Sequence, residues 1–166
     1  MEKELRKEYF DKAFKLHSAG KVVEAQNFYK KILRENPNDY EVLNLVGLGE
    51  LQKKNYQQAE EYVEKAISVK KVRYFYETLA QIYFLQKKYN KELETRLEEE
   101  QVFGLNFELA FGLGLVYKNL LNFEKSEKYY LKAVKLNPQS RDTYFNLANL
   151  YTLFHKPEKA KDYYLK

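Results

Sequence analysis

The sequence predicts an all-α fold, built as a solenoid of about five antiparallel helical hairpins. The 166-residue chain is rich in Leu, Lys, Glu and Ala, which favour helix, and only six glycines and three prolines are present to interrupt it. Small residues followed by paired aromatics recur about every 34 residues. Within each period, apolar residues three or four apart form two amphipathic stretches separated by a polar turn.

The repeats stay in register along the chain, so we expect a single array domain over residues 1–166. Residues 1–5 are expected to extend the first helix. Neighbouring hairpins must stack, because one hairpin cannot bury both of its faces. The expected repeats are 6–39, 40–72, 73–106, 107–140 and an incomplete fifth, 141–166.

The seventh and eighth residues of each repeat lie in its first helix. They are an apolar residue followed by a small one. A small side chain there lets the second helix approach closely, because a close-packed interior does not accommodate an extra methylene. These pairs are Val46-Gly47, Leu79-Ala80, Leu113-Gly114 and Leu147-Ala148, and Lys12-Ala13 departs from the pattern.

The second helix places a small residue at the twentieth place of the repeat and a bulky one at the twenty-fourth. The bulky residues are expected to fill the space between hairpins. An Asn-Pro turn at Pro37 and at Pro138 should end two of these helices. The two sets are Ala25, Ala59, Ser126 and Ala160, and Tyr29, Val63, Tyr130 and Tyr164.

The fourth repeat resembles the tetratricopeptide repeat family most closely, through Leu113-Gly114, Tyr117, Phe123, Ser126, Tyr130, Ala133 and Pro138. The resemblance covers nearly the whole chain. It implies a right-handed superhelix whose first helices line a concave groove, and a role as a scaffold that binds other proteins. Fold alone does not identify the partner.

The resemblance also implies which side chains face the groove. The sequence then predicts an apolar stripe with polar edges that binds a peptide or helix of a partner protein. An alternative is that the same aromatics pack on one another as a groove floor. The predicted partner-binding residues are Phe10, Phe14, Leu48, Leu51, Phe84, Leu85, Phe111, Leu115, Lys118, Phe145 and Asn149. The Lys, Asn and Arg set that grips chaperone carboxyl termini in one branch of the family is not present in any register.

The third repeat departs from the pattern. Glu92 stands where a small residue is expected, Arg96 where an aromatic is expected, and Glu99 in place of an alanine. We expect a solvated, slightly displaced helix held by apolar residues, and a hinge or altered twist near residues 90–106. The expected apolar contacts are Leu93, Leu97, Val102 and Phe103.

The last hairpin is expected to be open, with Tyr163 and Tyr164 at its outer face. Terminal repeats usually need a polar outer face. The chain is therefore expected either to be part of a longer protein or to associate with another copy through this end. A structural role as one span of an assembly is the alternative function, and a non-catalytic arm of a larger enzyme is another.

Other functional classes are disfavoured. The net charge of +5 is spread over helices in which lysines alternate with glutamates, so no nucleic-acid partner is expected. No apolar run approaches the roughly 20 residues that span a bilayer, and no secretory signal opens the chain, so the default location is the cytoplasm. The chain has no cysteine, and His17 and His155 stand alone as expected surface residues. We therefore expect no catalytic site, no cofactor and no metal.

Overall fold

The structure is a computed structural model that describes residues 3–165, and this range contains ten α-helices and no strand. They correspond to the paired helices of the predicted repeats, which confirms the all-α hairpin fold. In chain order they are α1 (Lys3–Ser18), α2 (Val22–Glu35), α3 (Tyr40–Gln52), α4 (Tyr56–Val69), α5 (Arg73–Leu85), α6 (Tyr89–Phe103), α7 (Phe107–Asn119), α8 (Phe123–Leu136), α9 (Arg141–Leu153) and α10 (Pro157–Tyr164).

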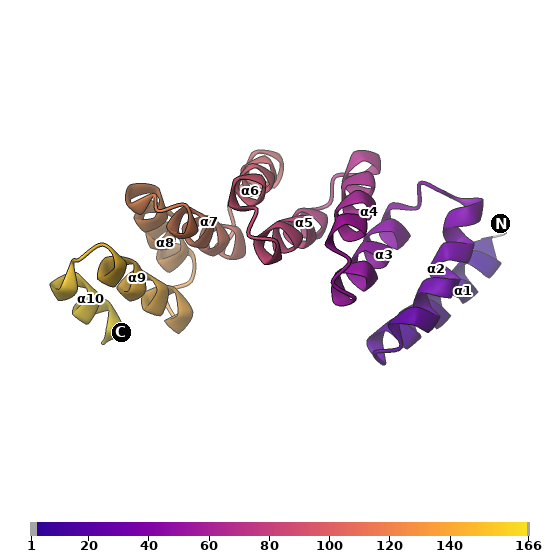
Figure 1. Ribbon diagram of the computed structural model, residues 1–166, viewed down its shortest axis with the longest axis horizontal. Helices are drawn as coiled ribbons and strands as arrows, with labels where there is room; N and C mark the ends of the chain where they lie inside the picture. Colours follow the sequence, from indigo (N-terminus) through magenta and orange to yellow (C-terminus); the bar gives the residue numbers. More distant parts are fainter. Residues whose placement is uncertain (1–2, 166) are drawn as a thin grey trace. The chain divides into compact units, whose positions relative to one another are not determined.

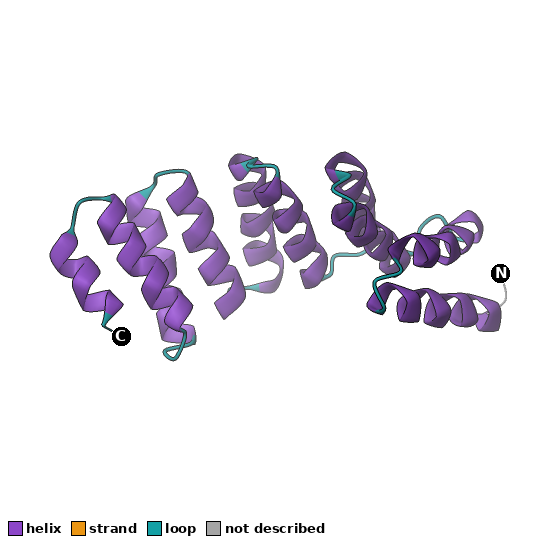
Figure 2. Cartoon of the chain, turned by 60° about the horizontal axis from the view of Figure 1, so that its bottom comes forward, coloured by secondary structure: helices purple, strands orange, loops and turns teal. Residues whose placement is uncertain are grey.

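The chain divides into two compact units that meet in sequence between Gln86 and Lys87. The N-terminal unit contains the hairpins α1–α2 and α3–α4 and the helix α5, while the C-terminal unit contains α6 and the hairpins α7–α8 and α9–α10 (Figure 1). Short turns join the two helices of each of these hairpins (Figure 2). The boundary between the units therefore lies within the third predicted repeat.

Each unit has its own hydrophobic core, made by the inner faces of neighbouring hairpins. In the N-terminal unit, Tyr29 of α2 packs with Val46 of α3, and a second cluster joins α3, α4 and α5 through Leu43, Val63 and Phe75. In the C-terminal unit the fully buried side chains include Leu109, Leu113, Tyr130, Leu147 and Leu150. Burial of this apolar surface is the main favourable contribution to folding.

The two helices of a hairpin approach most closely at the small residue in the eighth place of the repeat. A Cβ atom added to Gly114 would lie 2.5 Å from Cδ1 of Tyr130, and one added to Gly47 would lie 2.5 Å from Cγ2 of Val63. The Ser126 hydroxyl donates a 2.8 Å hydrogen bond to the Gly114 carbonyl at the same crossing. No methyl group fits between the helices at either position.

Two residues after each first helix ends, the chain passes through a residue with a left-handed backbone. The φ angles are +77° at Gly20, +62° at Lys54, +57° at Lys87, +56° at Leu121 and +55° at His155. After α7, the Leu121 and Asn122 amides donate to the carbonyls of Lys118 and Tyr117, at 3.0 and 2.9 Å, so the backbone groups at this helix end are paired. This conformation suits glycine, and a side chain at this place is strained.

Tyrosine hydroxyls join one hairpin to the next within each unit. Tyr83 of α5 donates to Glu60 at 3.1 Å and to Glu64 at 2.9 Å on α4, and Tyr151 of α9 donates to Glu127 of α8. Burial, and then the neighbouring glutamates, raise the pKa of Tyr83. These bonds to charged acceptors add to the stacking of the hairpins.

We predict that Gly114→Ala lowers the free energy of unfolding by about 1–3 kcal/mol, because the new methyl group overlaps the Tyr130 ring. Urea unfolding followed by circular dichroism measures this. In a Tyr130→Ala background the same substitution should have no cost. An equal cost in both backgrounds would show that the overlap with Tyr130 is not the cause.

Leu121→Gly should raise the free energy of unfolding by about 0.5–1 kcal/mol, because it removes the left-handed strain of an exposed leucine. The matched control is Leu97→Gly, since Leu97 is an exposed leucine in the interior of α6 and glycine weakens a helix interior by a similar amount. Thermal melts of the two variants should shift in opposite directions, and a loss of stability in both would contradict the assignment of strain.

Candidate functional site

The predicted partner-binding residues of the N-terminal unit lie on its first helices, and several are exposed. Phe14 of α1 is 52% exposed, and Phe84 and Leu85 of α5 are 37% and 45% exposed. Phe10 and Phe14 stack with their ring centroids 6.3 Å apart, and Leu48 of α3 is half-buried. Apolar surface for a partner is therefore present on this unit.

Leu51 differs from the rest of the predicted set. Only 9% of its surface is exposed, and it packs in the core cluster of α3, α4 and α5 with Leu43 and Tyr83. It offers little surface to a partner.

In the C-terminal unit, the predicted residues Phe111 and Leu115 of α7 are half-buried, whereas Phe145 of α9 is 56% exposed. The Phe111 ring packs 5.8 Å from that of Tyr130, so it is anchored to the core by one side. Phe145 and the half-buried Phe111 and Leu115 are candidate apolar contacts of this unit.

Two predicted polar residues of this unit are held in place by hydrogen bonds. Lys118 donates from Nζ to Oδ1 of Asn146 at 3.0 Å, and burial lowers the pKa of its ammonium group. Asn149 accepts a 2.7 Å hydrogen bond from the Tyr164 hydroxyl, and the Tyr164 ring meets Phe145 edge to face at 6.0 Å. Sequence reasoning assigned Tyr164 to the space between hairpins and to the open end of the last hairpin. The structure leaves it 50% exposed and places it beside Phe145 and Asn149.

Helix α6 departs in part from the interpretation that it is a solvated helix held by apolar side chains, although Leu93 does pack against the core cluster of α7 and Phe103 is half-buried. Glu92, Thr95 and Glu99 are its buried residues, at 0%, 7% and 1% exposure, while Leu97 and Val102 are 37% and 39% exposed. Acidic side chains of α6 are therefore buried at the places where other repeats have small residues.

Arg96 of α6 accounts for part of this arrangement. Its Nε donates a 2.9 Å hydrogen bond to Oε1 of Glu92, one turn earlier on the helix. Its guanidinium group lies against Gly112 of α7, where an added Cβ would be 2.3 Å from Nη1 and 2.6 Å from Cζ. Sequence reasoning missed this contact. The signal was an arginine at the twenty-fourth place of one repeat and a glycine at the sixth place of the next.

His17 is not the surface residue that the sequence suggested. It is half-buried, its ring lies 6.2 Å from that of Tyr29, and its Nδ1 is buried without a hydrogen-bond partner. Burial lowers its pKa. His155 is exposed, as expected. Over residues 3–165 no group of three or more His, Cys, Asp or Glu side chains is arranged to hold a metal ion, and no helix is both long and apolar enough to cross a membrane.

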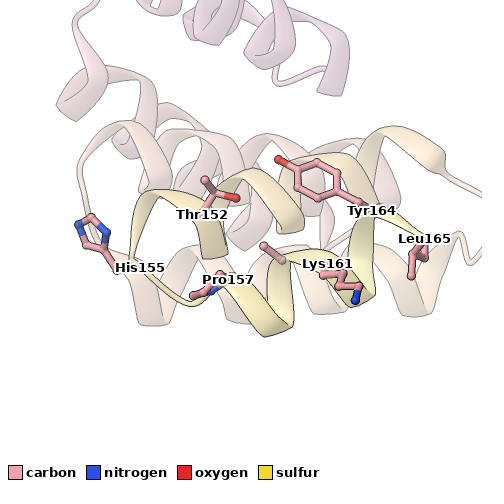
Figure 3. A pocket seen from close by; sticks show the side chains of 7 residues that line it. Thr152, His155, Pro157, Lys161, Tyr164 and Leu165 are labelled. Carbon is pink, nitrogen blue, oxygen red and sulfur yellow. The ribbon is translucent and has the colours of Figure 1, made fainter.

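A hollow of about 590 Å³ lies at the end of the last hairpin (Figure 3). Its walls come from the end of α9, the turn that follows, and α10. They are mostly apolar, and Tyr164 and Leu165 beside it are 50% and 78% exposed. The lining residues are Thr152, His155, Pro157, Ala160, Lys161, Tyr164 and Leu165.

Residues 40–72, 107–140 and 129–162 each match the tetratricopeptide repeat family. Together these matches cover more than half of the chain. The chain belongs to the tetratricopeptide repeat family.

Comparison with known proteins agrees with this assignment. A TPR repeat-containing protein of Methanocaldococcus jannaschii is 28% identical over 169 residues, and the chain spans only 29% of the length of that relative while 89% of the chain is matched. MamA from Desulfovibrio magneticus RS-1 is similar in structure, with a TM-score of 0.90, 20% identity, and coverage of 97% of this chain and 92% of that one. YrrB, described as a TPR protein with an unusual peptide-binding site, has a TM-score of 0.80, 18% identity, and coverage of 93% and 80%.

The buried Glu92 predicts a pH-dependent difference in stability. Burial raises the pKa of its carboxyl group, and Arg96 offsets this only in part. A raised pKa favours the folded state below the ordinary carboxyl pKa and loses that contribution as the pH rises. As the pH falls from 7 to about 4.5, the unfolding free energy of the wild type should therefore rise relative to that of Glu92→Gln. Urea titrations at both values measure it, and a shift the other way would mean that the ion pair with Arg96 dominates.

Proposed function

We propose that the protein is a scaffold whose first-helix faces bind a peptide or helix of a partner protein. The observation that carries the proposal is the exposure of large apolar side chains on first helices of both units. Phe14, Phe84 and Phe145 are 52%, 37% and 56% exposed, although α5 and α9 bury most of their other apolar residues. Apolar side chains gathered on one face typically mark a protein-interaction site.

Family membership supports this role, since the tetratricopeptide fold serves as a protein-interaction scaffold. The peptide-binding site described for YrrB belongs to a protein of the same fold, although at 18% identity the likeness extends to the fold alone. Each face also combines apolar and polar groups. In the C-terminal unit, Phe145 lies near the amide of Asn149, and such amides can pair with a peptide backbone.

We expect the triple variant Phe14→Ser, Leu48→Ser, Phe84→Ser to lose partner binding, because it removes apolar contact area from all three first helices of the N-terminal unit. Affinity capture from the native cell extract, quantified by mass spectrometry, measures this. Phe145→Ser tests the C-terminal unit in the same way.

The matched control is Val23→Ser, Val69→Ser, Leu136→Ser, which removes exposed apolar groups from second helices. This control should capture the same partner as the wild type, and both sets of variants should keep the helical circular dichroism spectrum. If the control loses the partner and the first-helix variants keep it, binding occurs on the opposite face and the proposal is wrong.

A structural role is the second candidate, in which the open end of the α9–α10 hairpin stacks against another hairpin. The apolar hollow beside Tyr164 and the exposed Leu165 favour it. Tyr163 contributes less, because its ring already stacks on Tyr144 and Tyr151. Sedimentation of the chain should then show association that rises with concentration and is lost in Tyr164→Ser, Leu165→Ser. A monomer mass at every concentration would exclude self-association through this end.

A further inference from the structure

Arg96 belongs to α6, the second helix of its repeat. Its side chain lies against α7, the first helix of the next repeat. Its guanidinium group occupies the space that a side chain at residue 112 would take. Gly112 directly follows Phe111 and lies three residues before Leu115, so it shares a helix face with Leu115. The arginine therefore reaches the surface on which the partner-binding residues of the C-terminal unit were predicted.

The guanidinium group has hydrogen-bonding capacity that the protein does not use. Arginine has five N–H donors, and within residues 3–165 the bond from Nε to Glu92 is the only hydrogen bond or ion pair that Arg96 makes. Both terminal amino groups thus lack an acceptor among the described residues, while 15% of the side chain remains open to solvent and neither amino group is among the buried atoms without a partner. Water can therefore accept from these donors in the free protein, and a ligand oxygen would take its place.

Glu92 positions the guanidinium group of Arg96 through an ion pair. Its side chain is fully buried, and it contacts Arg96 through Oε1 only, since Oε2 has no hydrogen-bond partner. An ion pair of this kind adds little stability, because desolvation offsets the attraction. The ion pair fixes the guanidinium group through Nε. The edge formed by the two terminal amino groups makes no hydrogen bond to any residue that the structure describes.

Two further charged side chains of α7, Lys118 and Glu108, lie within two turns of Gly112. Lys118 lies six residues after Gly112, about 9 Å further along α7, and donates only to a neutral amide. Glu108, one turn before Gly112, is an exposed carboxylate on the same helix. Its charge would repel a ligand that carries several negative charges. With Glu92 included, two cations and two carboxylates surround this apolar face, so the free edge of the Arg96 guanidinium, and not an excess of positive charge, fits a peptide with one acidic side chain.

We propose that Arg96 receives the side-chain carboxylate of an Asp or Glu in the bound partner, so that the C-terminal unit selects an apolar segment with an acidic residue. This inference rests on the proposed function and names the chemistry of its partner. The planar guanidinium matches a carboxylate in two parallel hydrogen bonds, which lysine cannot reproduce. The apolar neighbours of that acidic residue would pack against Phe111 and Phe145.

The test uses the full chain and a library of random peptides displayed through their C-termini, so that no displayed peptide has a free terminal carboxylate. The enriched peptides are synthesised with amidated ends, and each Asp or Glu is replaced by Asn or Gln. We expect enriched sequences to combine an acidic residue with aromatic or aliphatic ones, and the amide versions to bind at least about tenfold more weakly. That loss should disappear in Arg96→Met and persist in Lys128→Met, which removes an exposed lysine of α8.

Arg96→Lys should weaken binding of the acidic peptides by at least about tenfold while keeping the charge. The double variant Glu92→Gln, Arg96→Met guards against misfolding, because it leaves no unpaired buried carboxylate at residue 92. The same peptides should lose binding to Phe145→Ser. If Phe145→Ser abolishes binding but the Arg96 variants do not change it, the proposed function stands and the carboxylate anchor is wrong. If neither change matters, or if no peptide is enriched, both are wrong.

Discussion

The close approach of two helices at one small residue is the constraint on which the rest of the structure depends. At Gly47 and Gly114 the first helix carries no side chain, and Val63 or Tyr130 of the second helix occupies that space. Because this contact sets how near the helices lie, it also determines which first-helix side chains remain outside the core. Phe14 and Phe145 are exposed since the opposite side of each helix is committed to the hairpin and to its neighbour. The surface proposed to bind a partner is thus a consequence of how the hairpins pack.

The second helix of repeat three carries buried and partly buried polar residues at places that are small or aromatic in other repeats. Glu92 and Glu99 are buried where other repeats have small residues, and Arg96 replaces the aromatic that elsewhere fills the space between helices. A half-satisfied buried ion pair contributes little to stability, so stability alone does not account for its presence. Room for the guanidinium group is provided by Gly112 of the following repeat. An arginine held beside the surface proposed to bind a partner is a physical reason to look for function at this point.

Most of the fold could be predicted because the repeat period, the small residues and the Asn-Pro turns are local signals that recur. The helices end where these signals place them, as at Glu35 and Leu136 just before the two Asn-Pro turns. The candidate site was predicted less well, since exposure depends on packing that no single repeat encodes. Leu51 occupies a groove place yet packs in the core, and the half-buried His17 lies against Tyr29. The polarity of α6 was misjudged because burial of glutamate depends on a partner, Arg96, whose direction sequence spacing does not give.

Site-specific photocrosslinking in the native cell tests the central claim most directly, because it reports which surface a partner touches. A photoreactive phenylalanine analogue would replace Phe14 on α1 or Phe145 on α9, and Val69 on α4 or Lys128 on α8 for comparison; all four residues are exposed. The account predicts crosslinks to a discrete partner protein from Phe14 or Phe145 and none from Val69 and Lys128. Crosslinks that arise only from Val69 or Lys128 would contradict it, since the partner would then bind second helices.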